Sequence, residues 1–236
     1  MRIEIWSDVV CPWCFIGKRR LETALAAFEH ADEVEVVYRS FELDPSAPRN
    51  GTERTVDALT RKYGPQAPQM MAQVESIARA EGFAFQQDRT VHGNTIDAHR
   101  LLHLALAEGG PAQQVAVKEA FLSANFEQAR NLSDPAELRE VAIAAGLPAE
   151  RVDVVLGSDE YADDVAADVE QARAFGATGV PFFVVDRAFG LSGAQSVEVF
   201  TQVLERAWSQ AHPTLVQVGG DDADACGPDG CAVPGA

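Results

Sequence analysis

Two cysteines separated by two residues, in Cys11-Pro12-Trp13-Cys14, have the clearest chemistry in this chain. Thiol–disulfide exchange needs a thiolate that attacks a disulfide and a second thiol that resolves the resulting mixed disulfide. The spacing meets this need when the segment opens a helix, because the first cysteine then lies exposed at the positive end of the helix dipole. We therefore predict Cys11 as the nucleophile and Cys14, one turn further in and more buried, as the resolving thiol.

Two other interpretations of this pair are less favoured. Cys-x-x-Cys forms half of many zinc sites, but the other half is then a second such pair or two histidines at ligand spacing. Two ordinary core cysteines would not explain the Pro-Trp between them directly after a strand. The chain has four cysteines in 236 residues, too few for a disulfide scaffold in a chain that can bury a sufficient core without one.

A second pair, Cys226 and Cys231, encloses Gly-Pro-Asp-Gly near the C-terminus. These residues favour a turn, so the two thiols can approach to disulfide distance. The segment from His212 to Cys226 spans up to ~45 Å when extended. That length reaches Cys11 on a protein with a radius of gyration near ~18 Å. We predict an auxiliary redox pair that exchanges electrons with the first; a passive turn-closing disulfide or adventitious metal binding is an equally good alternative.

The charge balance excludes several classes of partner. The chain has 36 acidic and 19 basic side chains, a formal net charge of −17, which disfavours nucleic acid and anionic membranes as partners. The first residues lack the basic start and apolar core of a signal peptide, and no apolar run is long enough to span a membrane. We therefore expect a cytoplasmic protein, in which a Cys-x-x-Cys cycles between dithiol and disulfide.

The elements around the cysteines predict a strand–helix–strand unit. Residues 2–6 alternate polar and apolar, and a helical pattern begins at the cysteines. Residues 33–41 are β-branched and aromatic, which predicts a second strand. Near the other end, residues 182–185 and 189–192 are predicted strands, and residues 195–208 form an amphipathic helix. The chain thus begins as β-α-β and finishes as β-β-α.

Helices fill the middle of the chain. Capping residues and breakers delimit them at residues 52–64, 68–81, 95–108, 111–129, 135–145, 148–156 and 159–175. Gly109 and Gly110 separate the third helix from the fourth.

This order of elements predicts an α/β protein with a thioredoxin fold. Residues 1–44 and 171–211 form the thioredoxin-fold domain, and residues 45–170 form an all-helical insertion. Residues 212–236, rich in Gly, Asp and Pro, are predicted to be a flexible tail that carries the second cysteine pair.

Three segments resemble the cytoplasmic DsbA-like proteins called FrnE. They are SDVVCPWCFIGK at residues 7–18, NTIDAHR at 94–100 and TGVPFF at 178–183. They occur in the family's order, and the resemblance covers essentially the whole chain. It implies a DsbA-type thioredoxin fold with a helical insertion and thiol–disulfide oxidoreductase or isomerase activity. FrnE-like proteins also often end in a similar Cys-x4-Cys.

The resemblance implies that Pro181 is the family's cis-proline, beside the cysteine pair. The backbone of Val180 would then pair with an extended substrate chain held against Cys11. From the residues alone a trans proline that starts a strand is the alternative, since only ~5% of X–Pro bonds are cis.

The same resemblance places Asn94, Thr95 and His99 at the cleft, facing it from the insertion. Their ordinary interpretation is also good, because Asn94 or Thr95 can cap a helix. His99 and His103 have metal-pair spacing, but no zincin glutamate accompanies them, and we expect no metal.

Pro12 and Trp13 lie inside the motif and are expected to contact substrate. Trp13 stands where DsbA has a histidine, so a cationic stabiliser of the thiolate is missing. This difference favours reductase or isomerase activity over dedicated oxidase activity.

We therefore expect disulfide exchange with protein or peptide thiols, by a monomer or homodimer, without a cofactor and with glutathione as a candidate redox partner. One alternative is a glutathione-dependent isomerase or transferase of the 2-hydroxychromene-2-carboxylate isomerase or kappa type. Those enzymes share the inserted fold but have Ser where Cys11 stands. A second alternative is a chaperone-like or metal-binding protein without turnover.

Overall fold

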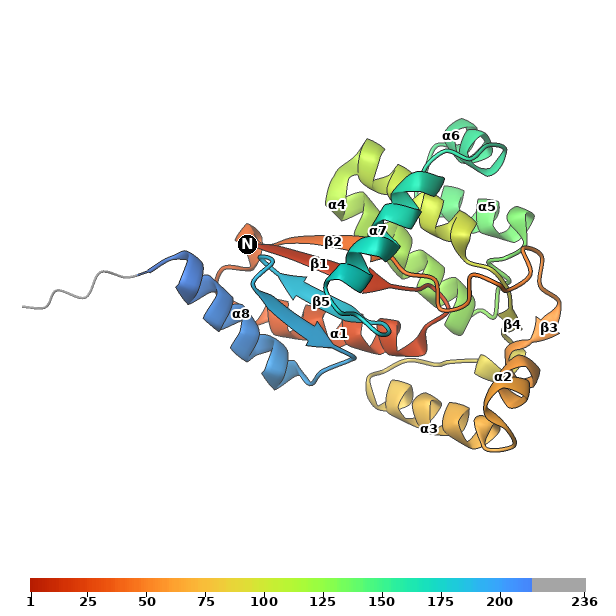
Figure 1. The fold of residues 1–236 in the computed structure, drawn as a ribbon, viewed down its shortest axis with the longest axis horizontal. Helices are drawn as coiled ribbons and strands as arrows, with labels where there is room; N and C mark the ends of the chain where they lie inside the picture. Colours follow the sequence, from red (N-terminus) through yellow and green to blue (C-terminus); the bar gives the residue numbers. More distant parts are fainter. Residues whose placement is uncertain (214–236) are drawn as a thin grey trace, which may run out of the picture.

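A four-stranded sheet forms the centre of the protein (Figure 1). The computed structural model describes residues 1–213, so Cys226 and Cys231 lie outside the described residues. The strand order is β2 (Glu35–Ser40), β1 (Arg2–Ser7), β5 (Phe182–Val185) and β6 (Phe189–Ser192). Strands β1 and β2 are parallel and joined by α1 (Pro12–Ala26), whereas β5 is antiparallel to both β1 and β6. This arrangement confirms the predicted thioredoxin fold.

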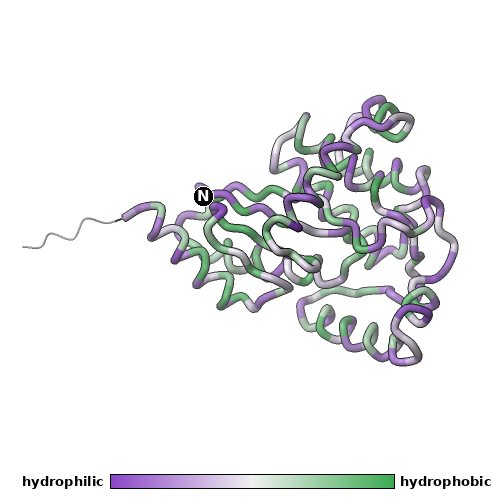
Figure 2. The backbone as a smooth tube through the Cα atoms, in the orientation of Figure 1, coloured by the Kyte–Doolittle hydropathy of each residue, from purple (hydrophilic) through white to green (hydrophobic). Residues whose placement is uncertain are grey.

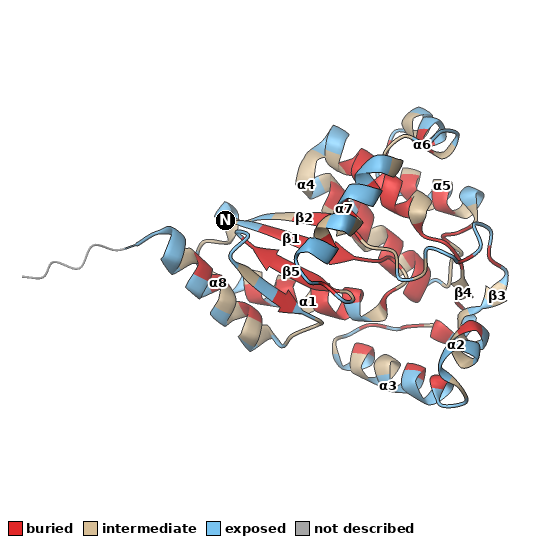
Figure 3. Cartoon of the chain, viewed as in Figure 1, coloured by how far each residue is buried: buried red, intermediate tan, exposed pale blue. Residues whose placement is uncertain are grey.

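Alternation along the strands sends their side chains into two separate cores. Ile3 and Ile5 pack with residues of α1 and of α8 (Val197–Ala211) on one face. Trp6 lies on the other face, beneath α7 (Ala162–Ala174). The tube of α8 in Figure 2 alternates between hydrophobic and hydrophilic residues, as expected for a helix with one buried face. The sheet is therefore covered by helices on both faces, and Figure 3 shows its central strands as buried.

The insertion consists mainly of helices with a core of their own. Its longest helix, α4, is assigned over Ile96–Phe126, but Gly110 has a φ of 72° and interrupts it. The predicted break at this glycine is therefore confirmed. The other helices are α2 (Thr55–Tyr63), α3 (Ala67–Ala80), α5 (Pro135–Ala144) and α6 (Ala149–Leu156).

The insertion also contains a short strand pair that the sequence did not predict. Strands β3 (Glu53–Arg54) and β4 (Val91–His92) are antiparallel, so the insertion is not entirely helical. Strands of two residues show no detectable alternation, which explains the difference. Two short 3₁₀ helices, Ala31–Glu33 and Gln87–Arg89, complete the described elements.

Helix α4 closes the edge of the sheet at β2. The Tyr38 N–H donates to Gln114 Oε1 at 2.8 Å, and Gln114 Nε2 donates to the Tyr38 carbonyl at 2.9 Å. One amide side chain thus satisfies both backbone groups of an edge residue. Because α4 belongs to the insertion, this contact fixes the insertion against the strand–helix–strand unit that carries the cysteines.

No helix within residues 1–213 combines the length and apolar character that crossing a membrane requires.

Candidate active site

The cysteine pair lies where β1 passes into α1. Cys11 is the N-cap of α1, with extended backbone angles, and Pro12 occupies the first turn. Proline suits this position because its missing N–H would have no helical partner there. The Cys14 N–H donates to the Cys11 carbonyl at 3.0 Å, and both cysteines are free thiols.

The expectation that Cys11 is exposed was wrong. Its exposed fraction is 4%, against 3% for Cys14, so burial does not distinguish the two. The Cys11 thiol donates to the Val180 carbonyl at 3.5 Å, a contact across 169 positions of the chain. The segment before β5 therefore covers the sulfur. The local sequence around Cys11 predicts the start of a helix, but it cannot predict this contact with a distant segment.

The Val180–Pro181 peptide bond is cis, as the family resemblance implied. Gly17 allows α1 to approach this proline closely. A Cβ atom added at Gly17 would lie 3.1 Å from Pro181 Cγ and 3.2 Å from Phe183 Cζ. The cysteine helix and the cis-proline segment thus approach so closely that a larger residue at position 17 would push its neighbours apart.

The two thiols have opposite pKa shifts. Interaction with Cys14, together with burial, raises the pKa of Cys11 well above its usual value. Burial also disfavours charge on Cys14, but the neighbouring Cys11 thiol and the positive charge of Lys118 outweigh it and lower the pKa of Cys14. The two thiols therefore titrate as one pair, in which a charge on one sulfur disfavours a charge on the other, and Lys118 favours the charge on Cys14.

Buried charged side chains lie beside the cysteines. Asp8 is fully buried, accepts a hydrogen bond from the Leu43 N–H at 2.8 Å, and has Oδ1 3.4 Å from His99 Nε2. Although burial raises the pKa of Asp8, the contact with His99 and this backbone bond lower it overall. Lys118, on α4, is also fully buried, and its positive charge reaches both Asp8 and the cysteines.

This geometry corrects the predicted role of His99. Its side chain is completely buried against Asp8 and does not face a cleft. His103, one turn along α4, points to a different region, with Nε2 3.1 Å from Asp168 Oδ2. Within residues 1–213 no three His, Cys, Asp or Glu side chains are grouped to hold a metal ion.

A cavity of about 370 Å³ opens beside the motif. Thr95 lines it, whereas Asn94 serves the backbone, accepting from the Ile96 N–H and donating to the Pro45 carbonyl. Trp13 is 37% exposed next to the cysteines. The walls are mainly apolar and come from the motif and the insertion, including Val10, Pro12, Leu43, Leu59, Tyr63 and Phe126.

Sequence reasoning missed Asp8 and Lys118 as members of the site. Asp8 stands three residues before Cys11, inside the segment that carries the family resemblance. Lys118 follows Gln114 by four positions and precedes Leu122 by four, and both are buried. A lysine on the apolar stripe of a helix is the signal that could have revealed it.

The fold and the site define a thioredoxin-fold protein with a helical insertion, a Cys-x-x-Cys at a helix N-terminus and a neighbouring cis-proline. Residues 2–205 match the DSBA-like thioredoxin domain family, and the chain belongs to this family. It therefore has the fold of the DsbA-like oxidoreductases. The FrnE-like subgroup stays a prediction.

Solved structures agree with this assignment. The chain is similar to a probable DsbA oxidoreductase from Streptomyces coelicolor, with 50% identity over 100% of both chains and a TM-score of 0.83. The cytosolic disulfide reductase DsbM from Pseudomonas aeruginosa, solved with glutathione, shares 19% identity over 88% of this chain and 99% of its own, with a TM-score of 0.60.

Two further similarities are more limited. A 2-hydroxychromene-2-carboxylate isomerase shares 15% identity over 89% of this chain and 98% of its own, with a TM-score of 0.65, and shows likeness of fold alone. The Bacillus subtilis protein YwbO is 44% identical over 46 residues, so the match spans only 20% of this chain and 21% of that protein.

Proposed function

We propose that the protein is a thiol–disulfide oxidoreductase that exchanges disulfides with protein or peptide thiols through Cys11 and Cys14. The observation that carries the proposal is the contact between the Cys11 thiol and the carbonyl of Val180, beside cis-Pro181. A substrate sulfur that reaches Cys11 must pass the backbone of this residue. An extended substrate chain can pair with that backbone as it would with a neighbouring strand.

In the reducing direction, the Cys11 thiolate attacks a substrate disulfide and forms a mixed disulfide, and one substrate sulfur leaves as a thiolate. The Cys14 thiolate then attacks Cys11, releases the second substrate thiolate and closes the Cys11–Cys14 disulfide. The protein dithiol loses two electrons and two protons, and the substrate disulfide gains them. Oxidation of a substrate dithiol is the reverse sequence.

The cavity supports a substrate with an apolar side chain near its cysteine. It begins at Pro12, next to the attacking sulfur, and its walls are largely apolar. We propose that this cavity binds a bulky apolar side chain while Val180 holds the substrate backbone. Glutathione, which is bound to the DsbM neighbour, is the candidate redox partner that restores the dithiol. A cytoplasmic site of action remains part of the proposal.

Single cysteine variants test the proposal. The wild type, incubated with oxidised glutathione, should form an internal disulfide between Cys11 and Cys14. Cys14→Ser should accumulate a mixed disulfide on Cys11, whereas Cys11→Ser should lose all reduction of a disulfide-bonded peptide. Mass mapping of trapped adducts and a peptide reduction assay measure these outcomes. Unchanged peptide reduction by Cys11→Ser would rule out the mechanism.

The Cys11→Ser variant also tests the isomerase alternative, when its turnover of 2-hydroxychromene-2-carboxylate is compared with that of the wild type. A glutathione-dependent isomerase uses the thiol of glutathione, so Cys11→Ser should retain turnover of 2-hydroxychromene-2-carboxylate if that activity were present. We expect no turnover with either protein.

The auxiliary pair remains a separate proposal. Cys226 and Cys231 lie outside the described residues, and their proposed role is to pass electrons to or from the first pair. A mass map of the oxidised wild type and of Cys14→Ser should contain a Cys11 adduct with Cys226 or Cys231. If neither protein contains such an adduct, the relay is wrong.

A further inference from the structure

Lys118 is a buried cation that has neither a hydrogen bond nor an ion pair within residues 1–213. Its side chain is fully buried on α4, and within residues 1–213 its Nζ has no hydrogen-bond partner. The ammonium lies 5.5 Å from the centre of the Tyr38 ring, on the β2 residue whose backbone Gln114 satisfies. Burying an unpaired charge is costly, and such groups are normally paired or absent. The position therefore calls for an explanation other than packing.

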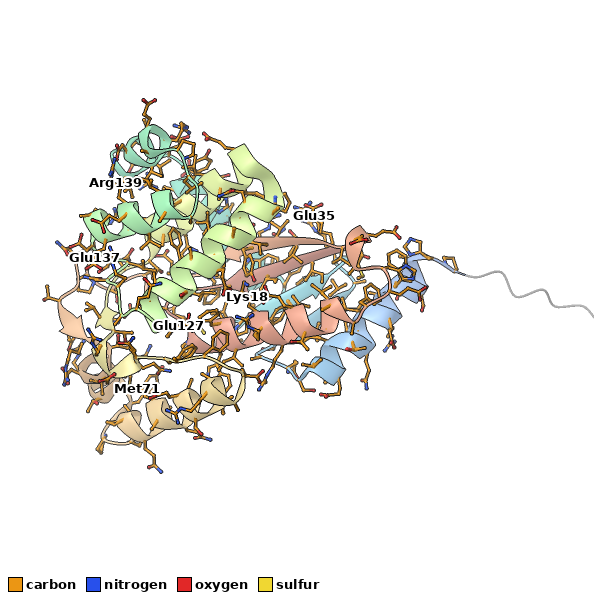
Figure 4. All side chains as sticks on the ribbon, turned by 180° about the vertical axis from the view of Figure 1, so that it is seen from behind. Lys18, Glu35, Met71, Glu127, Glu137 and Arg139 are labelled. Atoms are coloured by element: carbon orange, nitrogen blue, oxygen red, sulfur yellow. The ribbon has the colours of Figure 1, made fainter. Side chains whose placement is uncertain are left out.

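A second buried lysine shows the ordinary arrangement. Lys18, on α1, is 5% exposed and forms ion pairs with Glu22 and Glu119. Figure 4 labels it between α1 and α4, the two helices that the ion pair with Glu119 joins. Lys18 is thus neutralised by two carboxylates, whereas Lys118 has none within salt-bridge distance among the described residues. The two lysines form a matched pair for experiment.

The charges that face Lys118 come from the cysteine segment. Burial lowers the pKa of Lys118 to about 8, and the negative charges of Cys14, Asp8 and Cys11 act against this decrease. Asp8 is already bonded to the Leu43 N–H and in contact with His99. The remaining neighbours are the ring of Tyr38 and the like charge of Lys18. The sulfur of Cys14 is therefore the group whose negative charge Lys118 can stabilise.

We propose that Lys118 is a positioning residue for disulfide exchange, a fixed positive charge that holds Cys14 as a thiolate while Cys11 is joined to the substrate. This inference rests on the proposed function. In the mixed disulfide the Cys11 sulfur carries no proton, so Cys14 loses the hydrogen bond that it receives from the Cys11 thiol. The lysine, which comes from the insertion, remains and keeps the resolving sulfur nucleophilic.

The same charge acts in both directions of exchange. In reduction, the Cys14 thiolate attacks Cys11 and the substrate sulfur leaves with the electron pair of the broken bond. In oxidation, a substrate thiolate attacks Cys11 and Cys14 leaves as the thiolate. Forming the internal disulfide removes the anion that compensates Lys118. The lysine therefore stabilises the reduced protein relative to the oxidised one. The protein is then a stronger oxidant than expected from Trp13, which replaces a cationic stabiliser of the thiolate.

Three variants test this inference. Lys118→Met removes the charge at similar volume, Lys118→Arg keeps it, and Lys18→Met removes the paired lysine as the control. The reduced fraction is measured in glutathione redox buffers, and the ultraviolet thiolate absorbance of Cys14 is titrated in a Cys11→Ser background.

Lys118→Met should shift the equilibrium about tenfold toward the disulfide, which is ~30 mV for a two-electron couple. It should also move the Cys14 titration to higher pH by a corresponding amount. Lys118→Arg should keep the wild-type values to a large extent, and Lys18→Met should change neither quantity more than twofold.

The outcomes separate this inference from the proposed function. If the wild type forms no Cys11–Cys14 disulfide with oxidised glutathione, the proposed function fails. If it does, and Lys118→Met matches the wild type in both measurements, only the role of Lys118 is overturned. An equal shift in Lys18→Met would also overturn it, because the loss of any positive charge, and not the place of Lys118, would then be the cause. Thermal unfolding of the oxidised forms serves as the control that Lys118→Met is folded.

Discussion

Two groups of buried charged side chains join the sheet to its helices, and they differ in how completely they are paired. Beneath α7, Glu4 accepts from Arg39 and Arg187, and Asp168 contacts Arg39, His103 and the Ser40 N–H. Beside the cysteines, Lys118 has no hydrogen-bond partner among the described residues, and Asp8 Oδ1 and both ring nitrogens of His99 also have none.

The two groups extend to opposite faces of β2, because Tyr38 and Arg39 are adjacent residues of one strand. Full pairing compensates the cost of burial and fixes one geometry. An unpaired charge such as that of Lys118 instead interacts with nearby groups that gain or lose charge, here the two thiols. We therefore expect the first group to contribute mainly to stability and the second to act mainly on the thiols.

The largest effect is expected at Asp168. Asp168→Ala leaves the Ser40 N–H and Arg39 without this acceptor, and breaking a buried pair costs about 3–5 kcal/mol. The free energy of unfolding from a denaturant titration measures this cost. The exchange equilibrium with glutathione should stay at the wild-type value, and Glu170→Ala, on the exposed side of α7, should change neither quantity. A tenfold shift of the equilibrium in Asp168→Ala would break the distinction between the two groups.

The pH dependence of stability should identify Lys118. Its pKa in the folded protein is about 8, below its usual value of 10.5. Between these values the unfolded chain binds more protons than the folded one, so stability rises with pH across this window. Under reducing conditions the wild type should therefore gain stability relative to Lys118→Met by a few kcal/mol between about pH 8 and pH 10.5. A difference that does not depend on pH across this window would mean that the pKa of Lys118 is not lowered in the folded protein.

A smaller effect is expected at Asp8. Its negative charge raises the pKa of Cys11 and compensates part of the charge of Lys118. Asp8→Asn keeps an acceptor for the Leu43 N–H but removes the charge, so thiolate should become more favourable. The equilibrium with glutathione should move toward the dithiol by several-fold, opposite in direction to Lys118→Met. A shift in the same direction as Lys118→Met would show that Asp8 acts only through local structure.

The smallest effect is expected at Gly17, where apolar packing and not charge adjoins the cysteines. The added Cβ of Gly17→Ala crowds Pro181 and Phe183, and overpacking costs about 1–3 kcal/mol. The higher helix propensity of alanine offsets roughly 1 kcal/mol of that cost. We expect a net loss of about 1 kcal/mol in denaturant unfolding, whereas Thr23→Ala at an exposed site of α1 should be neutral or stabilising. If Gly17→Ala shifts the redox equilibrium strongly, packing and charge are not separable here.

Much of the fold could be predicted because local patterns determine it. Residues 2–6 alternate in polarity, Pro12 marks the first turn of α1, and Gly110 breaks α4 as its sequence context indicated. The order of elements was sufficient for the thioredoxin fold. The cis bond before Pro181 required the family resemblance, since no local pattern distinguishes it from a trans bond.

The electrostatics of the site could not be predicted in this way. Cys11 is buried by Val180, which comes from a distant part of the chain, and its pKa is raised by Cys14 and by burial. Asp8, His99 and Lys118 converge from a loop and from α4, and only the packing of the insertion brings them together. Strands β3 and β4 escaped prediction because two residues show no period.

The way α4 is attached to β2 also determines whether the protein can be divided into modules. Gln114 completes the edge of the sheet, and Lys118, one turn later on the same helix, lies over the same tyrosine. Excising the insertion to obtain a minimal thioredoxin domain would uncover a strand edge and remove the lysine together. We therefore expect the two parts to unfold as one cooperative unit, with a single transition in calorimetry. A homologue without the insertion would therefore need other groups to satisfy the edge strand β2 and another positive charge to set the reduction potential of its thiols.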